Sequence, residues 1–130
     1  MRHAESGLQQ GCVTWFRLKY PELALLLFAV PNGGARTALE ASIMRGEGVT
    51  AGVADVLLLV PSGGFHGLCI EFKRQYYQAE HGKLKLKKTY QSSEQKEWQA
   101  AVEAQGYKYV VVRSLNEFIE LIINYLSTSN

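Results

Sequence analysis

The sequence predicts an α/β fold in which a mixed central sheet is flanked by helices. Apolar residues recur at helical spacing near both ends of the chain, which predicts amphipathic helices there. Between these helices lie short apolar runs bounded by Gly and Pro, which predict buried strands. The expected order of elements is helix, strand, helix, strand, strand, helix, strand, helix.

The N-terminal part should contain a helix, a strand and a second, short helix. The first helix is expected from about Ala4 to Lys19 and should end before Pro21. Its apolar face is formed by Leu8, Cys12, Trp15 and Phe16. The continuous apolar run 23–30 has strand length, and the sequence Pro-Asn-Gly-Gly at 31–34 predicts a turn after it. The short helix should span roughly 37–45.

Two apolar runs on either side of Gly63 predict an antiparallel hairpin. The run 56–60 is rich in Val and Leu and is typical of a central strand, and 68–73 is the returning strand. In a hairpin symmetric about Gly63, residues whose numbers add up to 126 face each other. Asp55 is then expected opposite Glu71.

The C-terminal part should contain a flap, two capped helices and a strand. Residues 74–91 have no clean period and are rich in Lys, Tyr and Gln, which indicates an exposed excursion. Ser92 with Gln95, and Ser114 with Glu117, are capping-box pairs that open two helices around a strand at 107–112. The apolar faces of these helices comprise Trp98, Ala101 and Val102 in the first, and Phe118, Leu121, Ile122 and Tyr125 in the second.

Length and composition indicate a single soluble domain over residues 1–130. Hydrophobic residues make up 47% and charged residues 20% of the chain, an ordinary globular balance. A run of the ~20 apolar residues needed to span a membrane is missing, as is the apolar stretch of a secretory signal, so a cytoplasmic protein is expected. Cys12 and Cys69 have no partner at a zinc-site spacing and are interpreted as buried hydrophobic residues.

Basic residues are concentrated in one stretch of the chain. Between residues 73 and 96, seven basic and two acidic residues give a net charge of +5, although the whole chain carries only +2. Such a stretch suggests a polyanionic partner, although runs of charge are more often solvated surface. The candidate DNA-contacting residues are Arg36, Arg74, Lys83, Lys85, Lys87 and Lys88.

Two carboxylates stand in strands that are otherwise apolar. Asp55 is the only aspartate of the chain, and Glu71 lies within the returning strand. Side chains alternate along a strand, so Glu71 and Lys73 should point to the same face. Directly opposed residues of an antiparallel pair have Cβ atoms ~5 Å apart, where two negative charges repel each other.

A bound cation would relieve this repulsion. Two carboxylates and water suit a hard divalent ion, most simply Mg²⁺, and Mn²⁺ should substitute for it. The alternative is a plain salt bridge between Glu71 and Lys73 on a solvated face. The presence of all three polar residues on one face of the most apolar strands favours a metal site.

The spacing of these residues resembles a known nuclease signature. Asp55, fifteen intervening residues and then Glu71-Phe72-Lys73 looks like the PD-(D/E)XK motif, although Ala54 stands where that motif has proline. Further elements in matching order extend the resemblance to the VRR-NUC (virus-type replication-repair nuclease) family over nearly the whole chain. These are Glu5 with Gln9, Asn32-Gly33-Gly34, Gly52 and Gln95.

The resemblance implies a restriction-endonuclease-like core and a set of roles. Asp55, Glu71 and the backbone carbonyl of Phe72 would bind the metal, and Glu5 would be a further carboxylate ligand. Lys73 would orient the attacking water and offset charge on the phosphate, with Gln95 beside it. Glu5 has an alternative role as a first-turn residue favoured by the helix dipole. Gln95 has an alternative role as a capping residue of its helix. A single side-chain rotamer of Gln95 is not expected to serve both the cap and the active site.

The predicted function is therefore a Mg²⁺-dependent DNA endonuclease. The resemblance further suggests a homodimer that acts on branched DNA such as four-way (Holliday) junctions, in DNA repair, in a bacterial or phage-infected cytosol. Candidate dimer surfaces are the apolar last helix and the Tyr-rich flap. Two alternatives remain: a non-catalytic nucleic-acid-binding module that retains the fold, and metal-dependent chemistry on another phosphoester such as a nucleotide.

Overall fold

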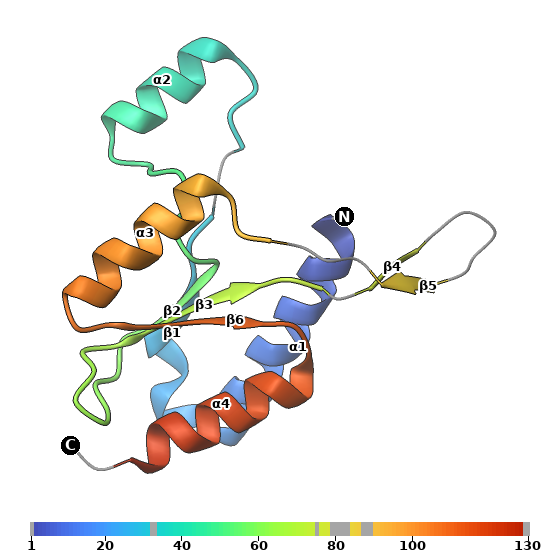
Figure 1. The fold of residues 1–130 in the computed structure, drawn as a ribbon, viewed down its shortest axis with the longest axis vertical. Coiled ribbons are helices and arrows are strands. Elements are labelled where there is room, and N and C mark those ends of the chain that lie inside the picture. The colour runs from blue at the N-terminus through green and yellow to red at the C-terminus, as the bar shows by residue number, and fades with distance from the viewer. Residues whose placement is uncertain (1, 32–33, 75, 79–83, 87–89, 129–130) are drawn as a thin grey trace.

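A computed structural model describes residues 2–31, 34–74, 76–78, 84–86 and 90–128 of the chain. The helices are α1 (Arg2–Lys19), the 3-10 helix η1 (Pro21–Leu26), α2 (Ala38–Gly46), α3 (Ser93–Ala104) and α4 (Leu115–Ser127). The strands are β1 (Leu27–Ala29), β2 (Val56–Leu58), β3 (Leu68–Phe72), β4 (Tyr76–Gln78), β5 (Leu84–Leu86) and β6 (Lys108–Val112). Figure 1 shows their arrangement. Among these elements, no helix is long and apolar enough to span a membrane.

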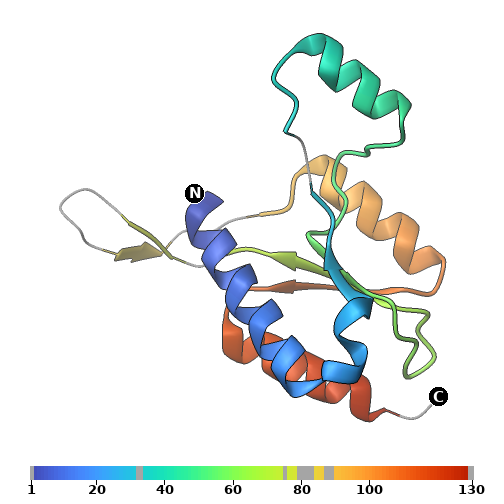
Figure 2. The ribbon, with the colours of Figure 1, turned by 180° about the vertical axis from the view of Figure 1, so that it is seen from behind.

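A mixed sheet of four strands forms the centre, in the order β1-β2-β3-β6. Strands β1, β2 and β3 are antiparallel neighbours, and β6 is parallel to β3. Helices α1 and α4 lie together on one face of the sheet, and α3 lies on the other (Figures 1 and 2). Helix α2 stands apart from these layers, and β4 and β5 pair as a separate two-stranded sheet.

The main core lies between the sheet and the pair α1 and α4. Alternate β3 residues Leu68, Ile70 and Phe72 point into it, as their spacing predicted. The other fully buried side chains of this core come from both helices and the remaining strands, and the largest are Phe16, Phe118, Leu27, Leu58 and Ile122. The apolar face of α4 formed by Phe118, Ile122 and Tyr125 is thus packed within the domain.

A smaller core fills the space between the sheet and α3. Cys69 and Tyr109 are buried there against the half-buried Trp98 and Val102, whereas Ala101, which was expected on the same face, is exposed. Burial raises the pKa of the Cys69 thiol to about 11 and that of Cys12 to about 12. Both thiols therefore stay protonated at neutral pH and behave as small hydrophobic groups.

The hairpin register agrees with its prediction. Val56 pairs with Ile70, Leu57 with Cys69 and Leu58 with Leu68, so paired residue numbers add up to 126. β2 and β3 are each shorter than the predicted runs. Asp55, one residue before β2, consequently lies beside Glu71 at the edge of the ladder.

The predicted strand over residues 23–30 is wrong in its first half. Residues 21–26 form η1, with Pro21 at the helix start and Glu22 in the first turn, where both residue types are favoured. Leu23 and Leu26 pack against the main core at the three-residue spacing of a 3-10 helix, while Leu25 is 93% exposed. A continuous apolar run does not distinguish a strand from a buried helical turn.

Two helix starts differ from the predictions. At α4, Ser114 Oγ accepts a hydrogen bond from Glu117 N, but Glu117 Oε1 accepts one from Arg113 N rather than from Ser114 N. That pair therefore forms only half of the expected capping box. A complete box, which was not predicted, opens α2, where Thr37 and Glu40 cap each other.

Candidate active site

Asp55 and Glu71 meet where β2 begins and β3 ends. Asp55 Oδ2 accepts a hydrogen bond from Phe72 N at 2.8 Å, which ties the carboxylate to the neighbouring strand. Glu71 is 3% exposed and stands on the α3 side of the sheet, with its side chain opposite that of Asp55. The hairpin register thus places two acidic groups in one desolvated space.

One oxygen of Glu71 has both a hydrogen bond and an ionic contact among the described residues. Glu71 Oε2 accepts a hydrogen bond from Gln95 Nε2 at 2.9 Å and lies 3.9 Å from Lys73 Nζ. Glu71 Oε1 is buried and has no hydrogen-bond partner in the described part of the chain. A buried carboxylate oxygen without a partner is costly, which points to a ligand that would bind it.

The electrostatics of the pair agree with this geometry. Burial, together with the Asp55 charge, raises the pKa of Glu71 from its ordinary value of 4.5 to about 8. Burial also raises the pKa of Asp55, against the lowering effect of the Phe72 hydrogen bond. Both shifts mean that the site holds two negative charges poorly without a cation.

Gln95 contacts Glu71 and caps α3 at the same time. Its Oε1 accepts a hydrogen bond from Ser92 N at 2.9 Å, while its Nε2 donates to Glu71 Oε2. The expectation that one rotamer could not serve both roles is therefore wrong. The two ends of an amide point in different directions, and one end faces each partner.

A glycine allows α3 to approach the carboxylates this closely. Gly52 has φ +86°, and a Cβ there would lie 2.3 Å from Glu94 O and 2.8 Å from Gln95 N. The loop before Asp55 therefore packs directly on the first turn of α3. This contact brings Gln95 within reach of Glu71.

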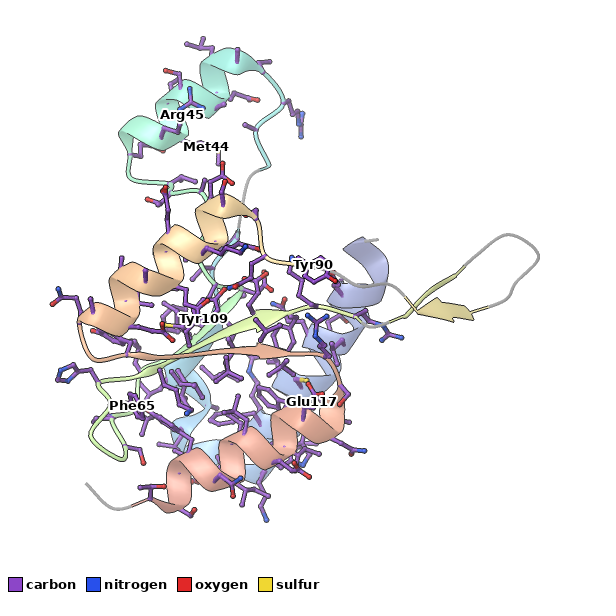
Figure 3. The ribbon with its side chains drawn as sticks, viewed as in Figure 1. Met44, Arg45, Phe65, Tyr90, Tyr109 and Glu117 are labelled. Carbon is purple, nitrogen blue, oxygen red and sulfur yellow. The ribbon has the colours of Figure 1, made fainter. Side chains whose placement is uncertain are left out.

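The pair lies in a cleft of about 520 Å³. Glu5 of α1, Lys73 and Gln95 line it together with Asp55 and Glu71, so the structure brings these five predicted residues together. Gly52 and Glu94 also line it, and the far wall is formed by α2 and the segments beside it. Figure 3 shows Met44 and Arg45, two residues of this wall.

The donor set of this cleft fits a hard divalent cation. Asp55 and Glu71 offer oxygen atoms of the kind that Mg²⁺ prefers, and Glu71 Oε1 is buried without a hydrogen-bond partner among the described residues. Within the described residues, no three His, Cys, Asp or Glu side chains lie close enough together to bind one ion. A metal would therefore need ligands beyond these two, namely water and the Phe72 carbonyl, with Glu5 reaching it only after a side-chain movement.

The described candidates for DNA contact do not line this cleft. Arg36 precedes α2 and is exposed, and Arg74 lines a separate groove beside α1 and Arg113. Lys85 lies in β5. Lys83, Lys87 and Lys88 lie outside the described residues, as do Asn32 and Gly33 of the turn predicted at 31–34.

Sequence reasoning missed the α2 wall of the cleft. Ala41, Met44 and Arg45 recur at i, i+3 and i+4 and so share one face of that helix. This spacing was visible in the sequence, but nothing in it indicated that the face would lie opposite the carboxylates.

Comparison with known proteins supports the fold. No protein-family model and no curated protein matches this sequence significantly. A solved structure described as a VRR_NUC domain protein superposes with a TM-score of 0.77 at 23% sequence identity, covering 97% of this chain and 90% of that chain. The mixed sheet with flanking helices is thus the fold of that VRR_NUC domain structure, and the resemblance inferred from the motif is confirmed at the level of the fold.

Proposed function

We propose that this protein is a Mg²⁺-dependent nuclease that hydrolyses phosphodiester bonds in DNA. The observation that carries the proposal is the buried pair Asp55 and Glu71, with one Glu71 oxygen lacking a partner and Lys73 on the same face. A solvated salt bridge does not account for this pair, because Glu71 is buried and its contact with Lys73 is long. The VRR_NUC-type fold supports the same class of chemistry.

Each residue of the cleft has a role in this chemistry. Asp55 and Glu71 would bind the cation together with the Phe72 carbonyl, and Gln95 fixes the orientation of the Glu71 carboxylate. Lys73 would donate to a non-bridging phosphate oxygen and orient the attacking water, since its ammonium group reaches the cleft. A bound Mg²⁺ would supply Lewis-acid activation of the phosphate and lower the pKa of a bound water.

The alternative hypothesis, a non-catalytic DNA-binding module, has less support than a nuclease. Phosphates are negatively charged, so a surface that only binds DNA has no use for two carboxylates facing them. Residues Asp55, Glu71 and Lys73 are all present and all line the cleft. These three residues could also act on a free nucleotide. The basic stretch 73–96 favours DNA over a nucleotide, because it suits a longer polyanion.

The finer parts of the proposal concern the substrate and the assembly. We expect selectivity for branched DNA such as four-way junctions, cut by a homodimer in the cytoplasm. Resolving a junction takes two symmetric nicks, and a two-fold dimer supplies two equivalent sites.

A cleavage panel tests the proposal directly. Labelled single strands, duplexes, flaps and four-way junctions are incubated with the protein in Mg²⁺, Mn²⁺ or EDTA. Cleavage in Mg²⁺ and Mn²⁺ but not in EDTA is expected, with branched DNA cut fastest. Binding of DNA without cleavage under any of these conditions would favour the binding module.

A further inference from the structure

Helix α2 packs loosely against the rest of the domain. None of its nine residues, all of them described, is buried. A nine-residue helix is marginal on its own, yet a complete capping box stabilises its start. A stabilised helix without a packing role is more consistent with binding than with support of the core.

The face of α2 that looks into the cleft is distinct from the outer face. Ala41 and Met44 are its only half-buried residues, and both line the cleft. Leu39 and Ile43 lie on the opposite side of the helix and are 70% and 52% exposed. Met44 lies on the side of α2 that faces α3 (Figure 3).

The two walls of the cleft differ in chemistry. Asp55, Glu71 and Lys73 make one wall charged, and Val49 joins Ala41 and Met44 to make the other largely apolar. Arg45 adds a cation beside the apolar wall. A ligand that matches both walls has an anionic group at one end and a flat or apolar group at the other.

We propose that the cleft holds one unpaired nucleotide of a DNA strand, with its phosphate at Lys73 and its base against Ala41, Met44 and Val49. This inference rests on the proposed function and deepens it, because it defines the substrate as DNA that is unpaired at the cut site. Pockets that accept flipped bases likewise place aromatic or apolar side chains against the base. Arg45 would contact a neighbouring phosphate.

The volume of the cleft favours an unpaired nucleotide over duplex. About 520 Å³ lies within the roughly 300–1,000 Å³ of pockets that enclose small ligands. A base within a duplex is stacked on both faces and cannot offer a face to α2. Branched DNA would be selected because its branch points supply unpaired nucleotides.

A binding experiment without metal tests the inference independently of cleavage. The Glu71→Gln protein in EDTA is titrated with a 2-aminopurine-labelled strand, free or within a duplex that is either fully paired or carries one unpaired labelled nucleotide. Fluorescence of 2-aminopurine reports the environment of that base. We expect tighter binding and a larger fluorescence change for the unpaired base, and a weakening of about fivefold or more in Met44→Ala.

A matched control lies on the same helix. Ile43→Ala removes apolar surface from the outer face of α2 and should leave binding unchanged. Equal affinity for paired and unpaired bases, or equal effects of the two substitutions, would overturn the inference. Tighter binding of free deoxynucleotide than of any strand would overturn it as well. If the wild-type protein in Mg²⁺ cleaves none of the DNAs while the preference for the unpaired base is kept, the proposed hydrolysis is overturned and the nucleotide site stands.

Discussion

Glu71 determines the electrostatic state of the cleft. It is buried, its pKa is raised to about 8, and one of its oxygens has no hydrogen-bond partner among the described residues. Without metal, the Glu71 carboxyl therefore keeps its proton to a higher pH than an ordinary glutamate does. A divalent cation would displace this proton on binding, so metal affinity should rise with pH.

Neutralising either carboxyl group should abolish cleavage and spare DNA binding. Glu71→Gln and Asp55→Asn keep the size of each side chain but remove the charge that would hold the cation. Cleavage of a labelled junction in Mg²⁺ should fall to background, while a gel-shift affinity in EDTA stays equal or improves. Normal cleavage by either variant would end the metal-site hypothesis.

The raised pKa of Glu71 also predicts a pH dependence of stability. Between pH 4.5 and about 8 the folded state holds a proton that the unfolded state has released, so stability falls as pH rises through this window. The raised pKa of Asp55 acts in the same direction. Without metal, Glu71→Gln should therefore gain thermal stability relative to wild type as pH rises from about 5 to 8.

Melting temperatures of both proteins across this range measure the effect. Adding Mg²⁺ should raise the melting temperature of the wild type at pH 8 and leave that of Glu71→Gln unchanged. Parallel melting profiles of the two proteins in EDTA would show that Glu71 is not desolvated in solution.

Lys73 should act in the transition state rather than in binding. Lys73→Met keeps the aliphatic stem and removes the ammonium group, so kcat should fall by about 100-fold or more. Arg74→Met is a matched comparison, because Arg74 follows Lys73 but lines a different groove. It should weaken binding and leave the single-turnover cleavage rate intact. A change confined to KM in Lys73→Met would make Lys73 a binding residue.

At the scale of elements, the loop before β2 determines how close α3 comes to the carboxylates. Gly52→Ala would place a methyl group against the backbone of Glu94 and Gln95, so the loop or the helix must move. Misplacement of about 1 Å can cost on the order of 100-fold in rate, and cleavage should fall by that order.

Gly48→Ala provides the control for this substitution. Gly48 also has a positive φ, +104°, but a Cβ there meets nothing within 4 Å. Both substitutions therefore introduce similar backbone strain, about 1–2 kcal/mol, and only Gly52→Ala adds the clash. Similar activities for the two variants would show that the packing of this loop does not position Gln95.

Sequence patterns predicted the elements whose period was unambiguous. The register of β2 and β3 followed from the turn at 61–64, and the burial of Phe118 and Ile122 from helical spacing. The run 23–30 was misjudged because continuous hydrophobicity carries no period, and only the packing of Leu23 and Leu26 reveals a helical turn. Alternation along β3 likewise placed Glu71 and Lys73 on one face.

Long-range placement was beyond the reach of these patterns. The sequence indicated that Gln95 caps α3, but its simultaneous contact with Glu71 depends on how closely the Gly52 loop packs on that helix. The position of α2 across the cleft depends in the same way on loops on both of its sides. The spacing of residues predicts the faces of a single helix or strand. The cleft is formed by several such elements, whose relative positions the spacing does not give.

At the scale of the whole molecule, the cleft and the basic stretch of the sequence have Lys73 in common. The cleft lies at the carboxylate end of the β2–β3 hairpin, and the stretch 73–96, with its net charge of +5, begins at Lys73. Approach of a polyanion would be steered to the cleft by this stretch. A domain of 130 residues with one such cleft would cut one strand in each encounter.

Junction cleavage therefore predicts that two copies act together. Two symmetric nicks need two equivalent sites, which a two-fold dimer supplies, and a second copy would also widen the DNA footprint of a small domain. Sedimentation velocity at micromolar concentration, alone and with a four-way junction, should give the mass of a dimer, and both nicks should appear within the lifetime of one complex. A monomer under both conditions that cuts flaps in preference to junctions would contradict this prediction. In that case the protein would be a structure-selective endonuclease that acts as a monomer and cuts one strand at a time.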